Sequence, residues 1–189
     1  MSRQSVRRPV HIAEYDKDWP RHFEQLRARI WAGVSDVAVR IEHVGSTSVP
    51  GLAAKPVIDL DLVIGSPNDL SQVVARLAGI GYPHLGDLGI EGREAFAAAV
   101  DGVDGPAHNL YVCAAGSLPL RNHLTIRDHL RNHAPDRATY SDLKKRLAAE
   151  HSNDIDAYVE GKTEFLMGIL VRHGFSRDDR NAVRRANQR

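Results

Sequence analysis

Two aspartates interrupt a strongly apolar run of the chain, and this feature constrains its fold more than any other. The run Val57 to Ile64 is rich in β-branched residues and is broken only by Asp59 and Asp61. That composition is typical of a central strand. Because residues two apart in a strand point to the same face, we expect the two carboxylates to be neighbours.

Neighbouring carboxylates in an apolar strand are electrostatically costly, and a bound divalent cation offsets that cost. Mg²⁺ or Mn²⁺ would suit the oxygen ligands of Asp59 and Asp61 and would ordinarily bring phosphate to the site. The alternative is structural: one aspartate caps a turn or pairs with a basic side chain at the sheet edge.

Four small residues precede this strand: Gly45, Ser46, Thr47 and Ser48. They follow a segment, 37–43, whose apolar and polar residues alternate as in a half-buried strand. Backbone amides and hydroxyls without bulky side chains are typical of loops that hold phosphate. A Gly-Ser turn can also serve turn geometry alone, so its spacing to the aspartates matters more than its composition.

The rest of the pattern predicts an α+β fold with a mixed sheet and a helical region packed against it. The further predicted elements are a helix after Asp18 and Pro20, a helix from 66–69 to Gly79, a hairpin of strands 94–100 and 108–115, and helices 118–133, 135–150 and 154–173. We expect one domain over 1–175, with its sheet part at about 8–115 and its helical part at about 117–174. Residues 176–189 are expected to form a flexible basic tail.

Composition excludes several classes of protein. Lys plus Arg (25) balances Asp plus Glu (24), so no global charge would draw the chain to nucleic acid or anionic lipid. The single cysteine, Cys113, lies in an apolar run and is expected to be a core residue. No stretch is long and apolar enough for a membrane span, and no signal peptide is evident after Arg3, so we expect a cytoplasmic protein.

The spacing from Gly45-Ser46 to Asp59 and Asp61 resembles the signature of the nucleotidyltransferase superfamily typified by DNA polymerase beta. The resemblance implies that the Gly-Ser loop holds a nucleoside triphosphate and that the aspartates hold metal ions. The longer block from Glu42 to Asp59 resembles the GrpB family of bacterial proteins. Further blocks resemble that family in the same order over about 10–172: Tyr15-Asp16 with Trp19-Pro20, His108 to Val112, Arg127 to Arg131, and Tyr140 with Leu143-Lys144.

Membership of the GrpB family implies a nucleotidyltransferase-like fold, often of unassigned activity and sometimes fused to dephospho-coenzyme A kinase. Active nucleotidyltransferases usually add a third carboxylate from a neighbouring strand. The corresponding strand here offers His108, Asn109 and Tyr111, and Glu94 on its partner is a weaker candidate. His108 is therefore the candidate third catalytic residue, as metal ligand or base, with a hydrogen bond to a carbonyl as the structural alternative.

Basic residues complete the candidate site. Lys55, between the loop and the aspartates, is a candidate phosphate ligand, although it can also be a solvated loop residue. His123, Arg127 and Arg131 recur every four residues and form one polar helix stripe. The family resemblance favours phosphate binding by Arg127 and Arg131 over surface ion pairs. Lys144 and Lys162 are expected on a solvated face, and His43 is expected to be structural.

The function predicted from these residues is metal-dependent nucleotidyl or phosphoryl transfer from a nucleoside triphosphate to a small acceptor, a reaction of the EC 2.7.7 class. The alternative is a non-catalytic nucleotide-binding or chaperone-like domain linked to coenzyme A metabolism. A metal-dependent hydrolase that uses the same aspartates with His108 is a third reading. Because aromatic residues do not interleave with the basic ones, nucleic acid is not an expected partner. The sequence leaves the oligomeric state open.

Overall fold

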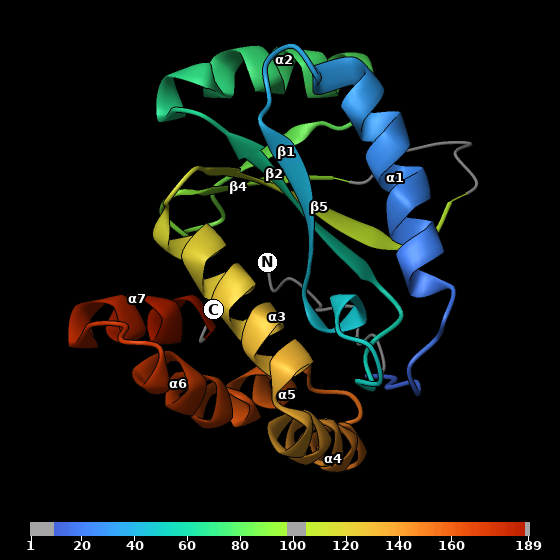
Figure 1. The fold of residues 1–189 in the computed structure, drawn as a ribbon, viewed down its shortest axis with the longest axis vertical. Coiled ribbons are helices and arrows are strands. Elements are labelled where there is room, and N and C mark those ends of the chain that lie inside the picture. Colours follow the sequence, from blue (N-terminus) through green and yellow to red (C-terminus); the bar gives the residue numbers. More distant parts are fainter. Residues whose placement is uncertain (1–9, 98–104, 188–189) are drawn as a thin grey trace, which may run out of the picture.

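The computed structural model describes residues 10–97 and 105–187 (Figure 1). Its centre is a five-stranded sheet in the order β1-β2-β5-β4-β3. The strands are β1 (Arg40–Val44), β2 (Ile58–Ile64), β3 (His84–Gly86), β4 (Arg93–Phe96) and β5 (His108–Ala114). Only β2 and β5 are parallel, and the other neighbours are antiparallel. The predicted mixed α+β class is confirmed.

The predicted pairing of the two hairpin strands is also confirmed, because β4 lies antiparallel to β5. The last part of the predicted first strand, 98–100, lies outside the described residues. The short strand β3 was not predicted, since three residues are too few to show a clear alternation.

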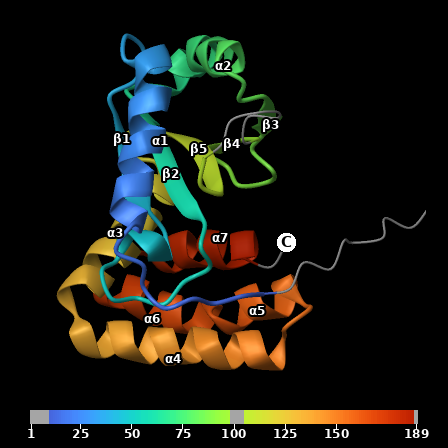
Figure 2. The ribbon, with the colours of Figure 1, turned by 90° about the vertical axis from the view of Figure 1, so that its right-hand side faces the viewer.

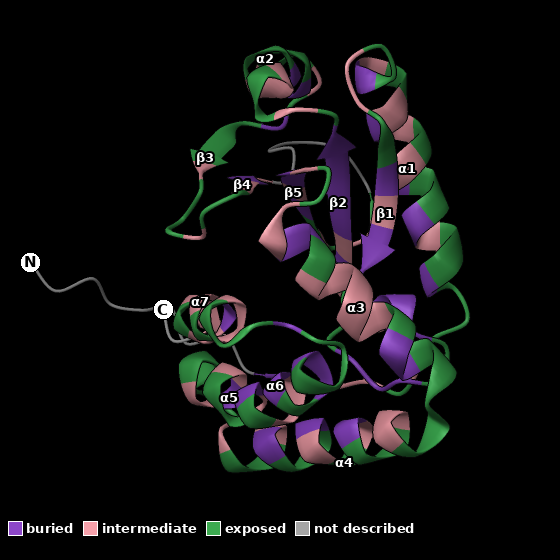
Figure 3. Cartoon of the chain, turned by 60° about the vertical axis from the view of Figure 1, so that its left-hand side comes forward, coloured by how far each residue is buried: buried purple, intermediate pink, exposed green. Residues whose placement is uncertain are grey.

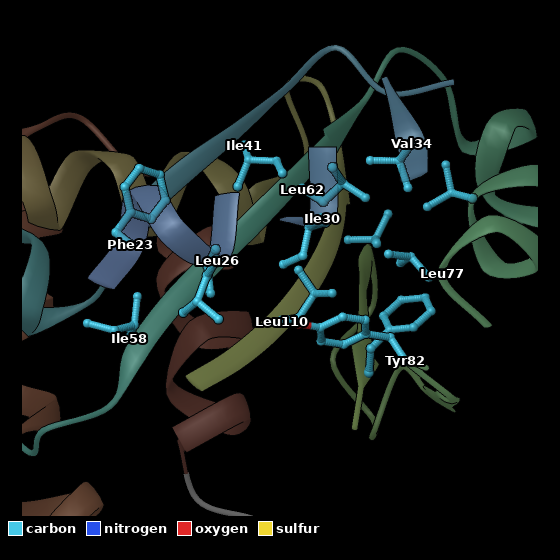
Figure 4. Close-up of a cluster of buried hydrophobic side chains, with 14 of the residues drawn as sticks. Phe23, Leu26, Ile30, Val34, Ile41, Ile58, Leu62, Leu77, Tyr82 and Leu110 are labelled. Carbon is cyan, nitrogen blue, oxygen red and sulfur yellow. The ribbon is translucent and has the colours of Figure 1, made fainter. Parts of the chain in front are cut away.

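Two helices, α1 (Trp19–Val34) and α2 (Leu70–Gly79), cover one face of the sheet. α1 buries the five apolar side chains that its periodicity predicts: Trp19, Phe23, Leu26, Ile30 and Val34. These meet alternate residues of the central strands, such as Leu62 and Leu110, in one hydrophobic core (Figure 4). The opposite face of the sheet is covered by the helical part, through α3 (Leu118–Asn132).

The helical part begins with α3 (Leu118–Asn132) and continues through α4 (Ala134–Glu150), α5 (Ile155–Gly161) and α6 (Thr163–Arg172). Figure 2 shows α4, α5 and α6 gathered at the end of the molecule opposite α2. The predicted single helix over 154–173 is thus two helices, and Gly161, a weak helix former, ends the first. No helix in the described part of the chain is long and apolar enough to cross a membrane.

The predicted flexible tail is wrong for most of its length, because Arg177–Asn187 forms a further helix, α7. Its one buried apolar side chain, Val183, packs with Met167, Leu170 and Phe175. Figure 3 shows α7 lying beside α6. Of the basic residues that give this segment the composition of a solvated tail, Arg180 and Arg184 are half-buried and Arg177 and Arg185 are exposed. A single well-placed valine is too weak a sequence signal to predict docking.

A pH effect on stability arises where β1 meets the core. His43 is buried, stacks on Phe23 with 4.6 Å between the ring centres, and lies 3.1 Å from the hydroxyl of Thr47. Burial, reinforced by the charges of Arg131 and Arg127, lowers the pKa of His43 to about 4. Between about pH 4 and the ordinary histidine pKa of about 6.5, His43 therefore binds a proton in the unfolded chain but not in the folded protein.

We therefore expect His43 to cost the protein about 2 kcal/mol of unfolding free energy as the pH falls from 7 to 5. Urea denaturation at the two pH values measures this for the native protein, for His43→Gln and for His11→Gln at an exposed site. The loss of unfolding free energy between pH 7 and pH 5 should be smaller by about 2 kcal/mol in His43→Gln, and it should be unchanged in His11→Gln. An equal loss in all three proteins would contradict the assignment.

Candidate functional site

Asp59 and Asp61 lie on the face of β2 that looks toward the helical part. The residues between and after them, Leu60 and Leu62, point the other way into the core with α1. In the parallel register, Asp59 is opposite Asn109 and Asp61 is opposite Tyr111. The predicted neighbour relation of the two carboxylates is therefore present, and the strand places it facing α3.

The two carboxylates differ in their partners. The side-chain amide of Asn109 donates a hydrogen bond of 2.8 Å to Asp59 Oδ1. Burial raises the pKa of Asp59, and this amide opposes the shift only in part. Asp61 is fully buried, its Oδ2 lies 2.7 Å from His123 Nδ1, and its Oδ1 has no hydrogen-bond partner in the described residues. A buried carboxylate oxygen without a partner is an available ligand position.

His123, from α3, was considered only as part of a helix stripe, and the structure brings it to the aspartates. Burial of its ring disfavours the proton, but the charge and hydrogen bond of Asp61 outweigh burial, so that the pKa of His123 is raised. The pair therefore holds a proton next to Asp61. The signal available in the sequence was the spacing of the stripe, which could not identify the strand it faces.

The loop before β2 packs directly against Asp59. Gly45 has φ +68° and ψ −174°, a region open essentially to glycine alone. A Cβ added to Gly45 would lie 2.1 Å from Asp59 Oδ2. Glycine at position 45 is thus required for this approach of loop and carboxylate, which the sequence spacing alone could not establish.

The three hydroxyl groups of the loop, on Ser46, Thr47 and Ser48, have different partners. Ser48 Oγ donates to the carbonyl of Gly45 at 2.6 Å, and Thr47 Oγ1 donates to the carbonyl of Val57 at 3.3 Å. Both bonds are internal to the loop. Two cavities lie beside Asp59. Ser46 lines both of them and Thr47 lines one, so Ser46 is the hydroxyl of this loop that a ligand can reach most directly.

Two cavities meet at Ser46, Asp59 and Lys162. The first, which we call the aspartate cleft, has a volume of about 250 Å³. It is further lined by residues that include Gly45, His123, Ile126, Arg127 and Tyr140. The second, the lysine cavity, has about 140 Å³ and is further lined by residues that include Thr47, Lys55, Asn109, Lys144 and Tyr158. Together they form one hollow between the sheet and the helices.

The expectation that Lys144 and Lys162 are solvated is wrong. Lys144 is 1% exposed, and its ammonium donates to Ser46 Oγ at 3.0 Å and to the carbonyl of Ala53. Burial, with the charge of Lys162, lowers the pKa of Lys144 to about 7. Burial, with the charge of Lys55, lowers the pKa of Lys162 to about 8. Three lysines therefore surround the Ser46 side of Asp59.

The two predicted phosphate-binding arginines have different places. Arg127 lines the aspartate cleft, although it also pairs with Glu42 at 2.7 Å and with Asp128 at 2.7 Å. Arg131 donates twice to the carbonyl of Ser48, at 3.0 and 2.8 Å, and does not line either cavity. Arg131 thus fixes the loop, and the prediction that it binds phosphate directly does not fit its position.

The prediction that places His108 beside the aspartates is wrong. His108 is paired with Ile58, so its side chain lies on the core face of the sheet. There Nε2 is 3.0 Å from the hydroxyl of Tyr82, and Nδ1 is 2.9 Å from the carbonyl of Pro106. Glu94 also turns away from the aspartates and pairs with His84 at 2.7 Å. Period two along the strand puts Asn109 at the site in place of His108.

These residues fit a metal ion of one particular kind. Within residues 10–97 and 105–187, no three His, Cys, Asp or Glu side chains are grouped so that they could hold a metal by themselves. Mg²⁺, however, is commonly bound by one or two carboxylates and completes its coordination with phosphate oxygens and water. Oδ1 of Asp61, which has no hydrogen-bond partner within the described part of the chain, lies next to Asp59. It fits that mode and would need a phosphate ligand to complete it.

The fold belongs to the nucleotidyltransferase-like class. A solved structure of the Cid1 poly(U) polymerase bound to MgATP matches 71% of this chain and 45% of that chain, with a TM-score of 0.50 and 10% identity. Within this class, the chain belongs to the GrpB protein family, which matches residues 9–172. The crystal structure of GrpB from Enterococcus faecalis covers 93% of this chain and 99% of that one, with a TM-score of 0.73 and 28% identity.

Relatives of known sequence agree with the family. UPF0157 protein YqkA of Bacillus subtilis is 34% identical over 160 residues, which cover 85% of this chain and 46% of YqkA. UPF0157 protein BH1888 of Halalkalibacterium halodurans is 34% identical over 163 residues, which cover 86% of this chain and 82% of BH1888. A dephospho-CoA kinase of Mycolicibacterium paratuberculosis is 28% identical over 183 residues, which cover 85% of this chain and 45% of the kinase. The chain spans about half the length of YqkA and of this kinase.

Proposed function

We propose that the aspartate cleft and the lysine cavity bind a nucleoside triphosphate with Mg²⁺ or Mn²⁺, and that the protein transfers its nucleotidyl group to a small acceptor. The observation that carries this proposal is the close packing of Gly45 against Asp59, beside Asp61, whose Oδ1 has no hydrogen-bond partner among the described residues. The nucleotidyltransferase-like fold supports it. A nucleotide with its metal is also the ligand in the Cid1 structure.

The chain offers a group for each part of this ligand. Asp59 and Asp61 would hold the metal ion, which when bound neutralises charge on the phosphates. Ser46 and the backbone amides of its loop would donate hydrogen bonds to the phosphate chain. Lys162 and Lys55 would face the phosphates with positive charge, since both line the lysine cavity beside Asp59. Lys144 would hold Ser46 in place.

In the transfer step, an oxygen of the acceptor forms a bond to the α-phosphorus of the triphosphate. The bond from that phosphorus to the bridging oxygen breaks, and its electron pair leaves with pyrophosphate. The acceptor proton passes to solvent. The lysines would stabilise the charge that develops on the leaving group, which is the main contribution of protein side chains in such reactions. A phosphoryl transfer would use the same residues with attack at the γ-phosphorus.

Thermal unfolding with each nucleoside triphosphate, in the presence of Mg²⁺ or Mn²⁺, tests this proposal. At a hundredfold excess over Kd, the preferred nucleotide should stabilise the native protein by about 2.7 kcal/mol, or roughly 5–10 °C. A variant with both Asp59→Asn and Asp61→Asn should lose the shift, and Asp142→Asn on the exposed side of α4 should keep it. If no nucleotide shifts the native protein, or if the double variant shifts equally, the proposal fails.

One observation favours a second candidate, a non-catalytic nucleotide-binding domain. The position at which a third carboxylate would complete the metal site holds Asn109, which is already bonded to Asp59. A regulatory link to coenzyme A metabolism would agree with the similarity to dephospho-CoA kinase. Release of pyrophosphate separates the two: the enzyme releases it with a suitable acceptor, whereas the sensor binds the nucleotide and releases none.

A further inference from the structure

A third and larger cavity, which we call the outer cavity, adjoins the aspartate cleft. Its volume is about 540 Å³, within the range of small-molecule sites. Its walls come from the loop Gly89–Arg93, the start of α3, and α7. Asn122, His123, Val183 and Asn187 line both this cavity and the aspartate cleft. A ligand in the outer cavity would therefore lie next to the partner of Asp61.

The charge on the wall of this cavity is mostly positive. Arg93 and Arg185 line it, and no carboxylate in the described part of the chain lies within 4.0 Å of either guanidinium. Glu91, an exposed residue, is the acidic side chain on the wall. Apolar side chains, including Ile90 and Leu118, provide the rest. Such a lining suits a small molecule with one anionic end.

Arg93 shows the clearest need for a ligand. The register places it on the helix-facing side of the sheet, opposite Cys113. Its guanidinium lies over the ring of Tyr111, 4.2 Å from the ring centre. Its Nε is buried and has no hydrogen-bond partner in the described residues. A buried donor without an acceptor is costly, and an anion that accepts its hydrogen bond removes that cost.

We infer that the outer cavity binds the anionic group, a carboxylate or a phosphate, of the acceptor in the proposed transfer, through Arg93 and Arg185. The acceptor oxygen that reacts would then point toward the wall shared with the aspartate cleft, at His123. The inference rests on the proposed function for the role of the ligand, but the anion site itself stands on the cavity and on Arg93. Arg185 lies in α7, beyond residues 9–172 that match the family.

Isothermal titration calorimetry with inorganic phosphate and with succinate, without nucleotide or metal, tests the site. Arg93→Gln should weaken binding of the preferred anion by about tenfold or more, because a charge-assisted hydrogen bond is lost. Arg185→Gln should weaken it less, and it keeps the test decisive if Arg93→Gln does not fold. The control variant Arg146→Gln, on the exposed side of α4, should bind the anion as the native protein does.

The two anions separate the two ligand chemistries, since preferential binding of one identifies the acceptor group as phosphate or carboxylate. The inference is overturned if neither anion binds, or if Lys162→Gln, in the lysine cavity, abolishes binding while both arginine variants retain it. Failure of the proposed function looks different. In that case no nucleotide stabilises the protein, although an anion still binds in an Arg93-dependent manner and so supports the outer cavity as a site.

Discussion

Gly45→Ala is expected to destabilise the protein by about 3 kcal/mol or more and to abolish the stabilisation by nucleotide. Two physical effects add. The backbone angles of Gly45 are strained for any residue with a side chain, and the new methyl would lie 2.1 Å from Asp59 Oδ2 and 2.8 Å from Asp59 Cγ. Both the loop and the carboxylate must then move. Urea denaturation measures the first effect, and thermal shifts with nucleotide and Mg²⁺ measure the second.

Gly116→Ala is the matched control, because Gly116 also has a positive φ, of +79°, but no atom of residues 10–97 and 105–187 lies within 4 Å of the added methyl. It should cost about 1 kcal/mol, from backbone strain alone. Asp59→Ala removes the two atoms closest to the methyl, so the double variant Gly45→Ala with Asp59→Ala should be more stable than the sum of the single changes indicates. Additive losses would show that the loop does not pack against Asp59.

The sequence was most informative where one local rule decided the outcome. The i and i+2 positions of Asp59 and Asp61 fix their common face once β2 is a strand. The periodicity of α1 fixes its buried stripe, from Trp19 to Val34. Both predictions needed no knowledge of which other elements lie nearby. The mixed sheet followed from the order of strands and helices along the chain.

Predictions that depended on the face of a second element were less successful. His108 and Asn109 are adjacent in β5, and only the register with β2 decides that Asn109 meets Asp59. Lys144 and His123 lie on helices of ordinary polar composition, and their partners are far away along the chain. A periodicity analysis treats such residues as solvated, because it cannot include the strand or loop that covers them.

The docking of α7 shows the same difficulty at the level of a whole element. Arg177–Asn187 has one buried residue, Val183, and abundant basic residues, so its composition resembles that of a solvated tail. What α7 contributes to the site depends on where the helix lies. It supplies a wall to both the aspartate cleft and the outer cavity, and this part of the site could not be read from local sequence.

Lys144→Ala is expected to cost about 3 kcal/mol of unfolding free energy. The side chain is 1% exposed, so its removal leaves a cavity in the packing of α4 against the Ser46 loop. The change also removes the donor to the carbonyl of Ala53. Lys145→Ala is the matched control, since Lys145 is its chain neighbour, is 43% exposed and pairs with Glu14. It should change stability by about 0.5 kcal/mol or less.

Lys144→Met separates the shape of this side chain from its charge. The folded pKa of Lys144, about 7, lies below the ordinary value of about 10.4, so the unfolded chain binds the proton more tightly in between. Stability of the native protein should therefore rise between pH 7 and pH 9, with about 2 kcal/mol of the rise due to Lys144. Lys144→Met should lack that part of the rise, and it should also bind nucleotide more weakly because Ser46 loses its anchor. Urea denaturation at pH 7 and pH 9 measures the change in unfolding free energy. If that change is the same in Lys144→Met as in the native protein, the ammonium of Lys144 is not buried.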